Sequence, residues 1–210
     1  VANPNAMFRK AIKPETYHKA EAVASPLNLF DIAPLADGAA ALILTTPELV
    51  PADFAHKAVR ITGSSVVVDR LALHDRVDPL GFDAVRFSVD AACRSAGILP
   101  GDLSFVELSD SFSIYAALTL EAAGFAPRGQ AAQRVSAGEF NLGGRLPINT
   151  LGGMKGRGYP VGAAGVYQAV DAVQQLRGEA GKNQVAGARR ALIHSLGGPA
   201  STAVAHVLEV

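Results

Sequence analysis

The sequence predicts a layered α/β fold in which helices cover a sheet. Segments with apolar residues at helical spacing alternate with short runs rich in β-branched residues, which is typical of such folds. A short turn with Gly197-Gly198-Pro199 separates the last two of these runs, and so short a turn predicts an antiparallel pair. Of the 210 residues, 49% are hydrophobic and 18% are charged, a balance that supports a buried core.

The first part of the chain predicts one strand and little other regular structure. Residues 1–30 mix prolines, charges and scattered apolar residues, which predicts a long loop with at most a short helix. Residues 31–46, "DIAPLADGAAALILTT", end in a continuous run of small and apolar residues, typical of a strand buried on both faces. A break at residues 47–57 separates this strand from a second, longer unit in which strands and helices alternate.

That second unit alternates strands and helices. The helices are recognised by apolar positions that recur every three or four residues and by glycines that follow the last turn. The predicted strands are residues 58–69, 103–110, 188–196 and 201–210, and the predicted helices are residues 82–96, 111–123 and 166–176.

Charge and cysteine content exclude several classes of function. Nineteen basic and nineteen acidic residues give a formal net charge of +0, so no overall field favours nucleic acid or an anionic membrane. The single cysteine, Cys93, excludes an intramolecular disulfide and a multi-cysteine metal site. No segment reaches the roughly 18 uninterrupted apolar residues of a membrane span, and no signal peptide is visible. We therefore expect a cytoplasmic protein without a metal site; because the chain begins at Val1, a fragment, a processed chain and a part of a longer chain all stay open.

A cluster of six glycines at residues 152–165, "GGMKGRGYPVGAAG", predicts a functional loop. Glycine loses more conformational freedom on folding than any other residue, so a dense cluster indicates tight turns or close backbone approach. Pro160 suits the first turn of a helix, which places Tyr159 just before a helix N-terminus. Free N–H groups there favour an anion or an oxyanion. The alternative is a structural crossover in which the glycines only make room for packing.

Two other segments end strands in a similar way. Residues 109–112, "SDSF", lie where a strand should end and a helix begin, and residues 193–198, "IHSLGG", end another strand in glycines. Because α/β proteins often bind ligands beyond the carboxyl ends of their strands, we expect the three segments to converge on one pocket.

The chain resembles the thiolases, in particular the branch of sterol carrier protein thiolases and archaeal thiolase-like proteins. The matching stretches follow the family's order and span nearly the whole chain: "NPNAMFRK", "DGAAALIL", "GGRLPINTLGGMKGRGYPVGAAG", "QLRGEAG" and "LIHSLGGPAS". The resemblance implies a thiolase fold with α/β/α layers. Residues 1–56 then correspond to the loop region and last strand of the N-terminal half, and residues 57–210 to the C-terminal domain. The family's nucleophilic cysteine lies before anything present here, and Cys93 is expected to be a buried structural thiol.

The two active-site motifs depart from the pattern of that branch. Its strand-to-helix motif usually reads His-Asp-Cys-Phe, with the cysteine as acid/base, whereas this chain has Ser109, Asp110, Ser111 and Phe112. Its glycine-rich loop reads Gly-His-Pro, where this chain has Gly158-Tyr159-Pro160. Claisen chemistry needs a base near neutral pH and donors for the thioester oxyanion. Serine is a poor base, and tyrosine, with an ordinary pKa of about 10, becomes one only where its surroundings lower that value.

Thiolase-fold steroid side-chain aldolases carry tyrosines in these two loop regions, and Tyr159 is similar to the second of them, while Ser109 departs from the first. The resemblance therefore favours retro-aldol cleavage of a β-hydroxyacyl-CoA. It implies catalytic roles for Tyr159, Ser109, Ser111, His194 and Ser195, and contacts with substrate or CoA for Gly158, Gly162, Phe112, Met154 and Gly197. Other interpretations of single residues are that His194 is a hydrogen-bonded core residue, that Asp110 caps the following helix, and that Arg9 and Lys10 meet CoA phosphates or lie in a solvated loop.

Two further functions stay open on the sequence alone. One is a conventional acetyl-CoA acyltransferase whose nucleophilic cysteine lies in an absent N-terminal half, and the other is a catalytically silent subunit that binds acyl-CoA or serves as a scaffold. We expect no cofactor besides the CoA thioester that is the substrate. The resemblance also implies a homodimer and an OB-fold acyl-CoA-binding partner in lipid metabolism.

Overall fold

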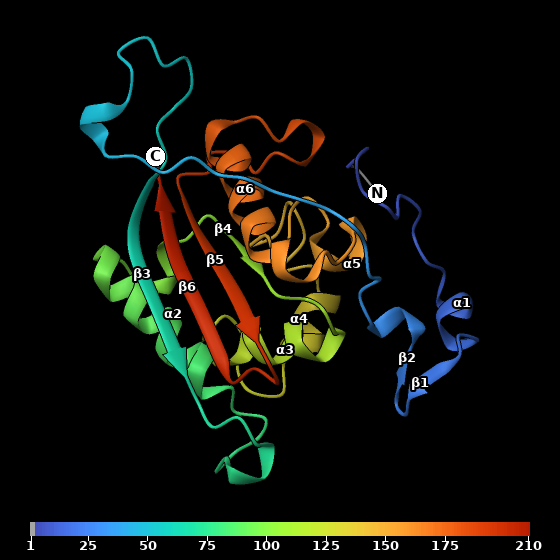
Figure 1. Ribbon diagram of the computed structural model, residues 1–210. Coiled ribbons are helices and arrows are strands. Elements are labelled where there is room, and N and C mark those ends of the chain that lie inside the picture. Colours follow the sequence, from blue (N-terminus) through green and yellow to red (C-terminus); the bar gives the residue numbers. More distant parts are fainter. Residues whose placement is uncertain (1–2) are drawn as a thin grey trace.

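The computed structural model describes residues 3–210 and has helices on both faces of a sheet, as the sequence predicts (Figure 1). The strands lie in the order β3 (Arg60–Val68), β6 (Thr202–Glu209), β5 (Arg190–Gly197) and β4 (Phe105–Leu108). β4 pairs with β5 in parallel, and the other pairs are antiparallel. All four strands were predicted at these places, including the antiparallel pair at the end of the chain.

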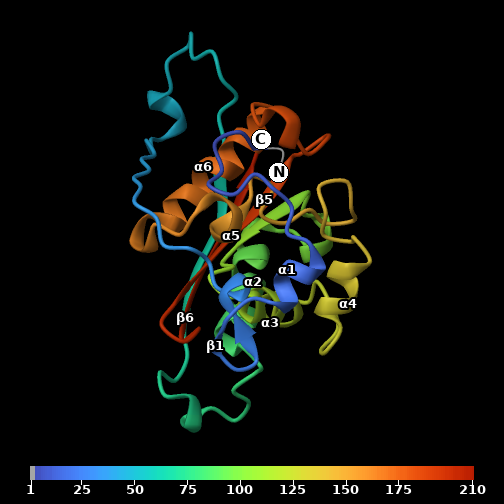
Figure 2. The same ribbon diagram turned by 90° about the vertical axis from the view of Figure 1, so that its right-hand side faces the viewer.

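Two apolar clusters cover the two faces of this sheet. One, the α2-side core, packs α2 (Asp83–Ala96) and α3 (Ser113–Ala122) against residues such as Val106, Leu108 and Leu192. The other, the α6-side core, packs α6 (Ala164–Arg177) against Phe105, Ala191 and Ile193. Figure 2 shows α6 and α2 in separate layers. Successive residues of a strand point to opposite faces, so each strand contributes alternate residues to the two cores.

Cys93 of α2 lies in the α2-side core with 2% of its surface exposed. Burial raises the pKa of its thiol to about 11, so the thiolate is not formed at neutral pH. The prediction of a buried structural thiol is confirmed.

The remaining helices are short. They are α1 (Pro14–His18), α4 (Ala131–Ser136) and α5 (Gly153–Arg157), together with the 3-10 turns Leu29–Asp31, Pro47–Leu49, Leu73–Asp75, Pro100–Asp102, Val161–Ala163 and Gly181–Asn183. No helix within residues 3–210 is both long and apolar enough to cross a bilayer.

Residues 3–30 confirm the expected loop with a short helix, to which they add a hairpin of β1 (Ala22–Ala24) and β2 (Leu27–Asn28); residues 1–2 lie outside the described part of the chain. The strand predicted at residues 31–46 is wrong. Only Ile32 and Leu35 form isolated bridges there, and residues 36–46 run extended across α6 without a partner strand among residues 3–210 (Figure 1). A strand needs a neighbour for its N–H and C=O groups, and the apolar pattern does not reveal whether one is present.

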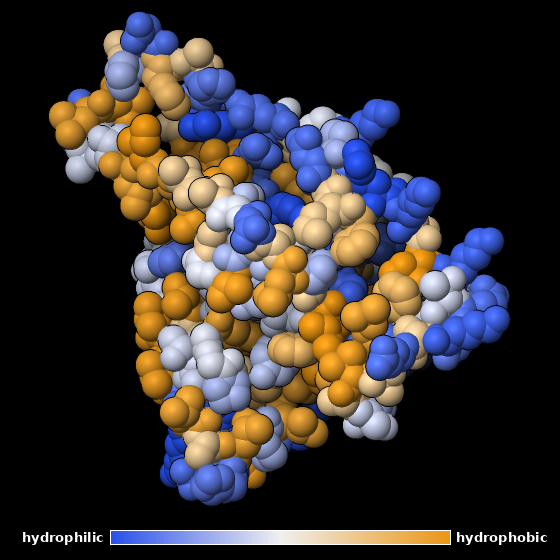
Figure 3. All heavy atoms as spheres, turned by 45° about the vertical axis from the view of Figure 1, so that its right-hand side comes forward, coloured by the Kyte–Doolittle hydropathy of each residue, from blue (hydrophilic) through white to orange (hydrophobic). Residues whose placement is uncertain are grey.

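The unpaired segment leaves apolar side chains in contact with solvent. Ile43 is 95% exposed and Leu44 is 75% exposed, although both belong to the most apolar run of the segment. Leu49, in the 3-10 turn that follows, is also exposed. Figure 3 shows hydrophobic residues on the lobe that projects at the upper left of that view. Contiguous exposed apolar surface of this kind is typical of an interaction site.

Candidate active site

The carboxyl ends of β4 and β5 lie side by side because these two strands are parallel. Ser109 follows β4 directly, is 3% exposed, and accepts a hydrogen bond at its Oγ from the backbone N–H of Leu196 at 3.0 Å. Ser195 precedes Leu196 on β5. The structure therefore joins two of the three segments that the sequence singled out.

The glycine-rich loop reaches the same edge through residues 33–36. The N–H of Ala33 donates to the carbonyl oxygen of Ser111 at 2.8 Å. The N–H of Tyr159 donates to the carbonyl of Pro34 at 2.8 Å, and the N–H of Ala36 donates to the carbonyl of Tyr159 at 3.1 Å. This short extended piece therefore holds the loop after β4 and the glycine-rich loop on its two sides.

Tyr159 is half-buried against a small cluster formed by Ala33, Met154 and Ala164. The chain turns helical directly after Pro160, first as the 3-10 turn Val161–Ala163 and then as α6, so the prediction of a helix start at this point is confirmed. Within residues 3–210, the Tyr159 hydroxyl makes no hydrogen bond. The side chain thus has a packed ring and an unused polar end.

Gly158 is a position where a side chain has no room. Its φ is +113°, in the region that favours glycine, and an added Cβ would lie 2.5 Å from the Met7 sulfur and 2.8 Å from the Ala36 Cβ. The N–H of Phe8 also donates to the carbonyl of Gly156 at 3.0 Å. The glycine therefore allows the N-terminal segment to lie directly on the loop.

Asp110 caps a helix, but not the helix that the sequence predicts. The N-cap of α3 is Phe112, which makes no side-chain capping bond. The Asp110 carboxylate instead accepts hydrogen bonds from the N–H groups of Met154 at 2.7 Å and Lys155 at 3.3 Å, at the start of α5. Burial raises the pKa of Asp110, while these backbone bonds act in the opposite direction. The expected cap on α3 is wrong because the side chain crosses to the glycine-rich loop.

Ser195 points toward α6. Its Oγ donates to Oε1 of Gln168, whose Nε2 in turn donates to the carbonyl of His194 at 3.3 Å. A Cβ on Gly165 would come within 3.0 Å of the Ser195 Oγ, so the helix approaches the serine closely at this glycine. The serine thus ties the end of β5 to the start of α6.

His194 lies on the opposite face of the sheet from Ser195. It pairs with Leu108, whose side chain belongs to the α2-side core, and it is 1% exposed. Burial lowers the pKa of His194 to about 4, so the ring is neutral at neutral pH. Neither ring nitrogen has a hydrogen-bond partner among residues 3–210. His194 is therefore a core residue, as one interpretation of the sequence expects, but it lacks the hydrogen bond that this interpretation includes. A catalytic role for His194 stays an untested prediction.

The residues expected to contact substrate or CoA have different environments. Met154 is buried under Tyr159, and the half-buried ring of Phe112 lies 5.2 Å from that of Tyr115. Gly162 is exposed at the helix start, and Gly197 is the last residue of β5, where it pairs with Thr202 of β6. Ser111 is half-buried between the two loops, while Arg9 and Lys10 are exposed beside the segment that covers the glycine-rich loop.

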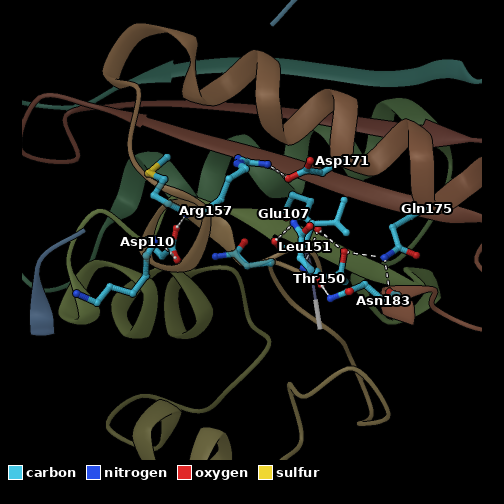
Figure 4. Close-up of polar contacts among 12 residues, drawn as sticks. Glu107, Asp110, Thr150, Leu151, Arg157, Asp171, Gln175 and Asn183 are labelled. Atoms are coloured by element: carbon cyan, nitrogen blue, oxygen red, sulfur yellow. Dashed lines mark hydrogen bonds and ion pairs between the residues drawn. The ribbon is translucent and has the colours of Figure 1, made fainter. Parts of the chain in front are cut away.

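A buried polar cluster was missed from the sequence (Figure 4). Glu107 of β4 is fully buried and accepts hydrogen bonds from the N–H and the hydroxyl of Thr150, at 2.9 and 2.8 Å. Arg157 pairs with Asp171 of α6. A charged residue inside the apolar strand "FVEL" was the available signal, since a buried carboxylate requires partners.

A sheet with helices on both faces and loops gathered at its parallel strand ends defines an α/β protein, and in such folds this edge is where ligands often bind. Residues 65–210 match the family described as Thiolase C-terminal domain-like. The chain belongs to the thiolase family.

Individual relatives agree with this assignment. The chain is 38% identical over 205 residues to an acetyl-CoA acetyltransferase of Methanothermobacter thermautotrophicus, covering 98% of this chain and 53% of the relative. It is 35% identical to human sterol carrier protein 2 over 94% of this chain and 37% of the relative. It is 34% identical to the benzoylsuccinyl-CoA thiolase subunit BbsB of Thauera aromatica over 93% of this chain and 51% of the relative. The chain thus spans about half the length of such relatives, or less.

The fold also matches a solved structure of a protein named Ltp2-ChsH2(DUF35) aldolase. The TM-score is 0.85 at 24% sequence identity, and the match covers 99% of this chain and 54% of that one. At this identity the likeness concerns the fold.

Proposed function

We propose that this chain forms part of the active site of an enzyme that breaks or makes a carbon–carbon bond next to a CoA thioester, with aldol-type cleavage preferred. One observation carries the proposal. The backbone of Tyr159 is hydrogen-bonded on both sides to residues 34–36, directly before a helix start and beside the loop that follows β4. These bonds fix the backbone at the position where the family has a histidine, and the Tyr159 hydroxyl has no hydrogen-bond partner among residues 3–210.

The proposed cleavage of a β-hydroxyacyl-CoA begins with removal of the β-hydroxyl proton. The oxygen becomes a carbonyl as the bond between the α and β carbons breaks, and the bonding electrons form the enolate of the shortened acyl-CoA. A proton then adds to its α carbon. Tyr159 would hold the thioester oxygen or transfer one of these protons, because a phenol can do either.

Ser109 would assist at the same edge. Its Oγ accepts a hydrogen bond from Leu196, and within residues 3–210 its own proton is donated to no group. That proton is free for a substrate oxygen or a water. Ser195 is less suited to this role because its hydroxyl donates to Gln168.

A conventional acyl transfer is the second candidate, and the names of the relatives favour it. An acetyl-CoA acetyltransferase and a thiolase subunit are among them. In that case a cysteine outside these 210 residues would carry the acyl group, and Tyr159 would act only as an oxyanion donor. If neither reaction occurs, the chain is a catalytically silent subunit that binds acyl-CoA.

The exposed run at residues 39–44 supports a proposal about organisation. We infer that residues 1–56 belong with an N-terminal half, where this run would find the neighbouring strand that residues 3–210 lack. We also propose that the protein forms a homodimer and binds an OB-fold acyl-CoA-binding partner. The solved aldolase is named for two components, Ltp2 and ChsH2(DUF35), which is in keeping with a partner protein.

Product analysis distinguishes the three functions. The purified protein, at its native length, is incubated either with a β-hydroxyacyl-CoA or with a β-ketoacyl-CoA plus free CoA, and the products are identified by mass spectrometry. We expect the first mixture to yield a shortened acyl-CoA and an aldehyde or ketone. Two acyl-CoA products from the second mixture alone would establish thiolysis instead. Binding without conversion of either would establish the silent subunit.

A further inference from the structure

The glycine-rich loop is anchored at its start by buried hydrogen bonds around Thr150 (Figure 4). In addition to its two bonds to Glu107, the Thr150 hydroxyl accepts from Nε2 of Gln175 at 2.8 Å. Its carbonyl accepts from Nδ2 of Asn183 at 2.7 Å. Thr150 therefore cannot move away without uncovering the Glu107 carboxyl.

Arg157 anchors the other end of the same loop. Its side chain is only 12% exposed, pairs with Asp171 of α6, and lies over the ring of Tyr167, with 4.6 Å between the guanidinium carbon and the ring centroid. Gly156 and Gly158 flank it and provide no side-chain contacts of their own. The position of Tyr159, two residues further on, thus depends on the contacts of this guanidinium.

The cluster contains polar atoms that lack partners. Oε2 of Glu107 and both Nε and Nη2 of Arg157 are buried without a hydrogen-bond partner among residues 3–210. The charged groups that act on Glu107 are Arg157, which favours the ionised carboxylate, and Asp110, which opposes it. Burial is the largest effect and raises the pKa of Glu107 from 4.5 to about 7, although the two hydrogen bonds from Thr150 act in the opposite direction. The closed loop thus keeps Glu107 protonated at pH values where a solvated glutamate is ionised.

We propose that Glu107 and Arg157 are positioning residues that latch the glycine-rich loop, and that the latch loosens when Glu107 gives up its proton to solvent. The inference rests on the proposed function only in that Tyr159 is the group being positioned. Opening of residues 150–157 admits water to Glu107, and this hydration favours the ionised form more than the loss of the two Thr150 bonds opposes it, because burial is the largest effect on the carboxyl. The closed state binds more protons, and raising the pH therefore favours opening.

The sign and range of the effect follow from this linkage. Protection of the loop's backbone amides from hydrogen exchange is greatest below the pKa of a solvated glutamate. It falls as the pH rises from that value to about 7, and it is constant above the pKa of the buried group. One proton is released on opening, so the equilibrium changes by at most about tenfold per pH unit.

Hydrogen–deuterium exchange of residues 150–160 between pH 5 and 8.5, corrected for intrinsic exchange rates, tests the latch. We expect protection in the wild-type protein to fall between pH 5 and 7, by at most about tenfold per pH unit, and then to level off. Glu107→Gln, which keeps an acceptor for Thr150 but does not titrate, should remove this slope. Arg157→Gln should lower protection at every pH and move the levelling-off to higher pH. Glu121→Gln, on α3, is the matched control and should keep the wild-type slope.

If protection depends on pH in Glu107→Gln as it does in the wild-type protein, the proposed latch is wrong. It is also wrong if protection in the wild-type protein does not change with pH. If Glu107→Gln does not fold, NMR can follow the chemical shift of the Glu107 carboxyl carbon with pH in the wild-type protein. A titration midpoint near 4.5 would then overturn the latch. Exchange does not require turnover, so this result is independent of the reaction. Tyr159→Phe should leave the exchange profile unchanged even where it abolishes activity.

Discussion

Replacing Tyr159 by phenylalanine is expected to lower kcat by about 10²- to 10³-fold, which corresponds to about 3 to 4 kcal/mol of transition-state stabilisation. The hydroxyl is the only group removed. Because it makes no hydrogen bond within residues 3–210 and the ring keeps its contacts with Ala33 and Met154, the free energy of unfolding should change by no more than about 0.5 kcal/mol. Steady-state kinetics and thermal unfolding of the same preparation measure the two effects.

Tyr115→Phe is the control for that substitution. It removes the same atom from a half-buried tyrosine on α3, where the ring packs against Phe82 and Phe112. This variant should keep most of the activity. Equal turnover of wild type and Tyr159→Phe would show that the phenol takes no part in the reaction.

Replacing Gly63 by alanine is expected to lower the free energy of unfolding by about 2 to 3 kcal/mol, the upper part of the range for overpacking. Gly63 lies on β3 where α2 approaches the sheet, and an added Cβ would lie well inside van der Waals contact with the carbonyl oxygen of Ala92. The obstacle is backbone, which a side-chain rotation cannot relieve. Thermal or urea unfolding should show the loss, as a decrease of about 5 to 10 °C in Tm for a chain of this size.

Gly101→Ala provides the comparison. Gly101 is exposed, and a Cβ there would meet no atom within 4 Å, so the same substitution should change the free energy of unfolding by less than about 0.5 kcal/mol. If both variants unfold alike, the close packing of α2 on β3 is not what limits stability.

The sequence predicts the second unit of this fold well because its elements depend on contacts within that unit. The helix over residues 82–96 and the strand over residues 201–210 each pack against neighbours that are present, and their apolar periodicity reflects this. The predicted strand at residues 31–46 fails for the opposite reason. Its composition suits burial between neighbours, but residues 3–210 supply no strand beside it.

The site was only partly predictable. The three segments lie together because parallel pairing places the ends of β4 and β5 at one edge and Asp110 bonds the glycine-rich loop at Met154, while their convergence on one pocket stays a prediction. The direction in which each side chain points was harder to predict than the place of its residue in the fold. His194 and Ser195 are neighbours in sequence but point to opposite faces, and Asp110 reaches across to α5 rather than along its own chain. Glu107 was missed because its partner Thr150 lies 43 residues further along the chain.

A crystal structure of the protein, at its native length, with a non-reactive acyl-CoA thioester analogue would show whether Tyr159 contacts the thioester. We expect the thioester oxygen to lie about 2.7 to 3.1 Å from the Tyr159 hydroxyl, at the edge formed by the ends of β4 and β5. A thioester bound away from that edge, or a Tyr159 hydroxyl turned away from the bound acyl group, would contradict it.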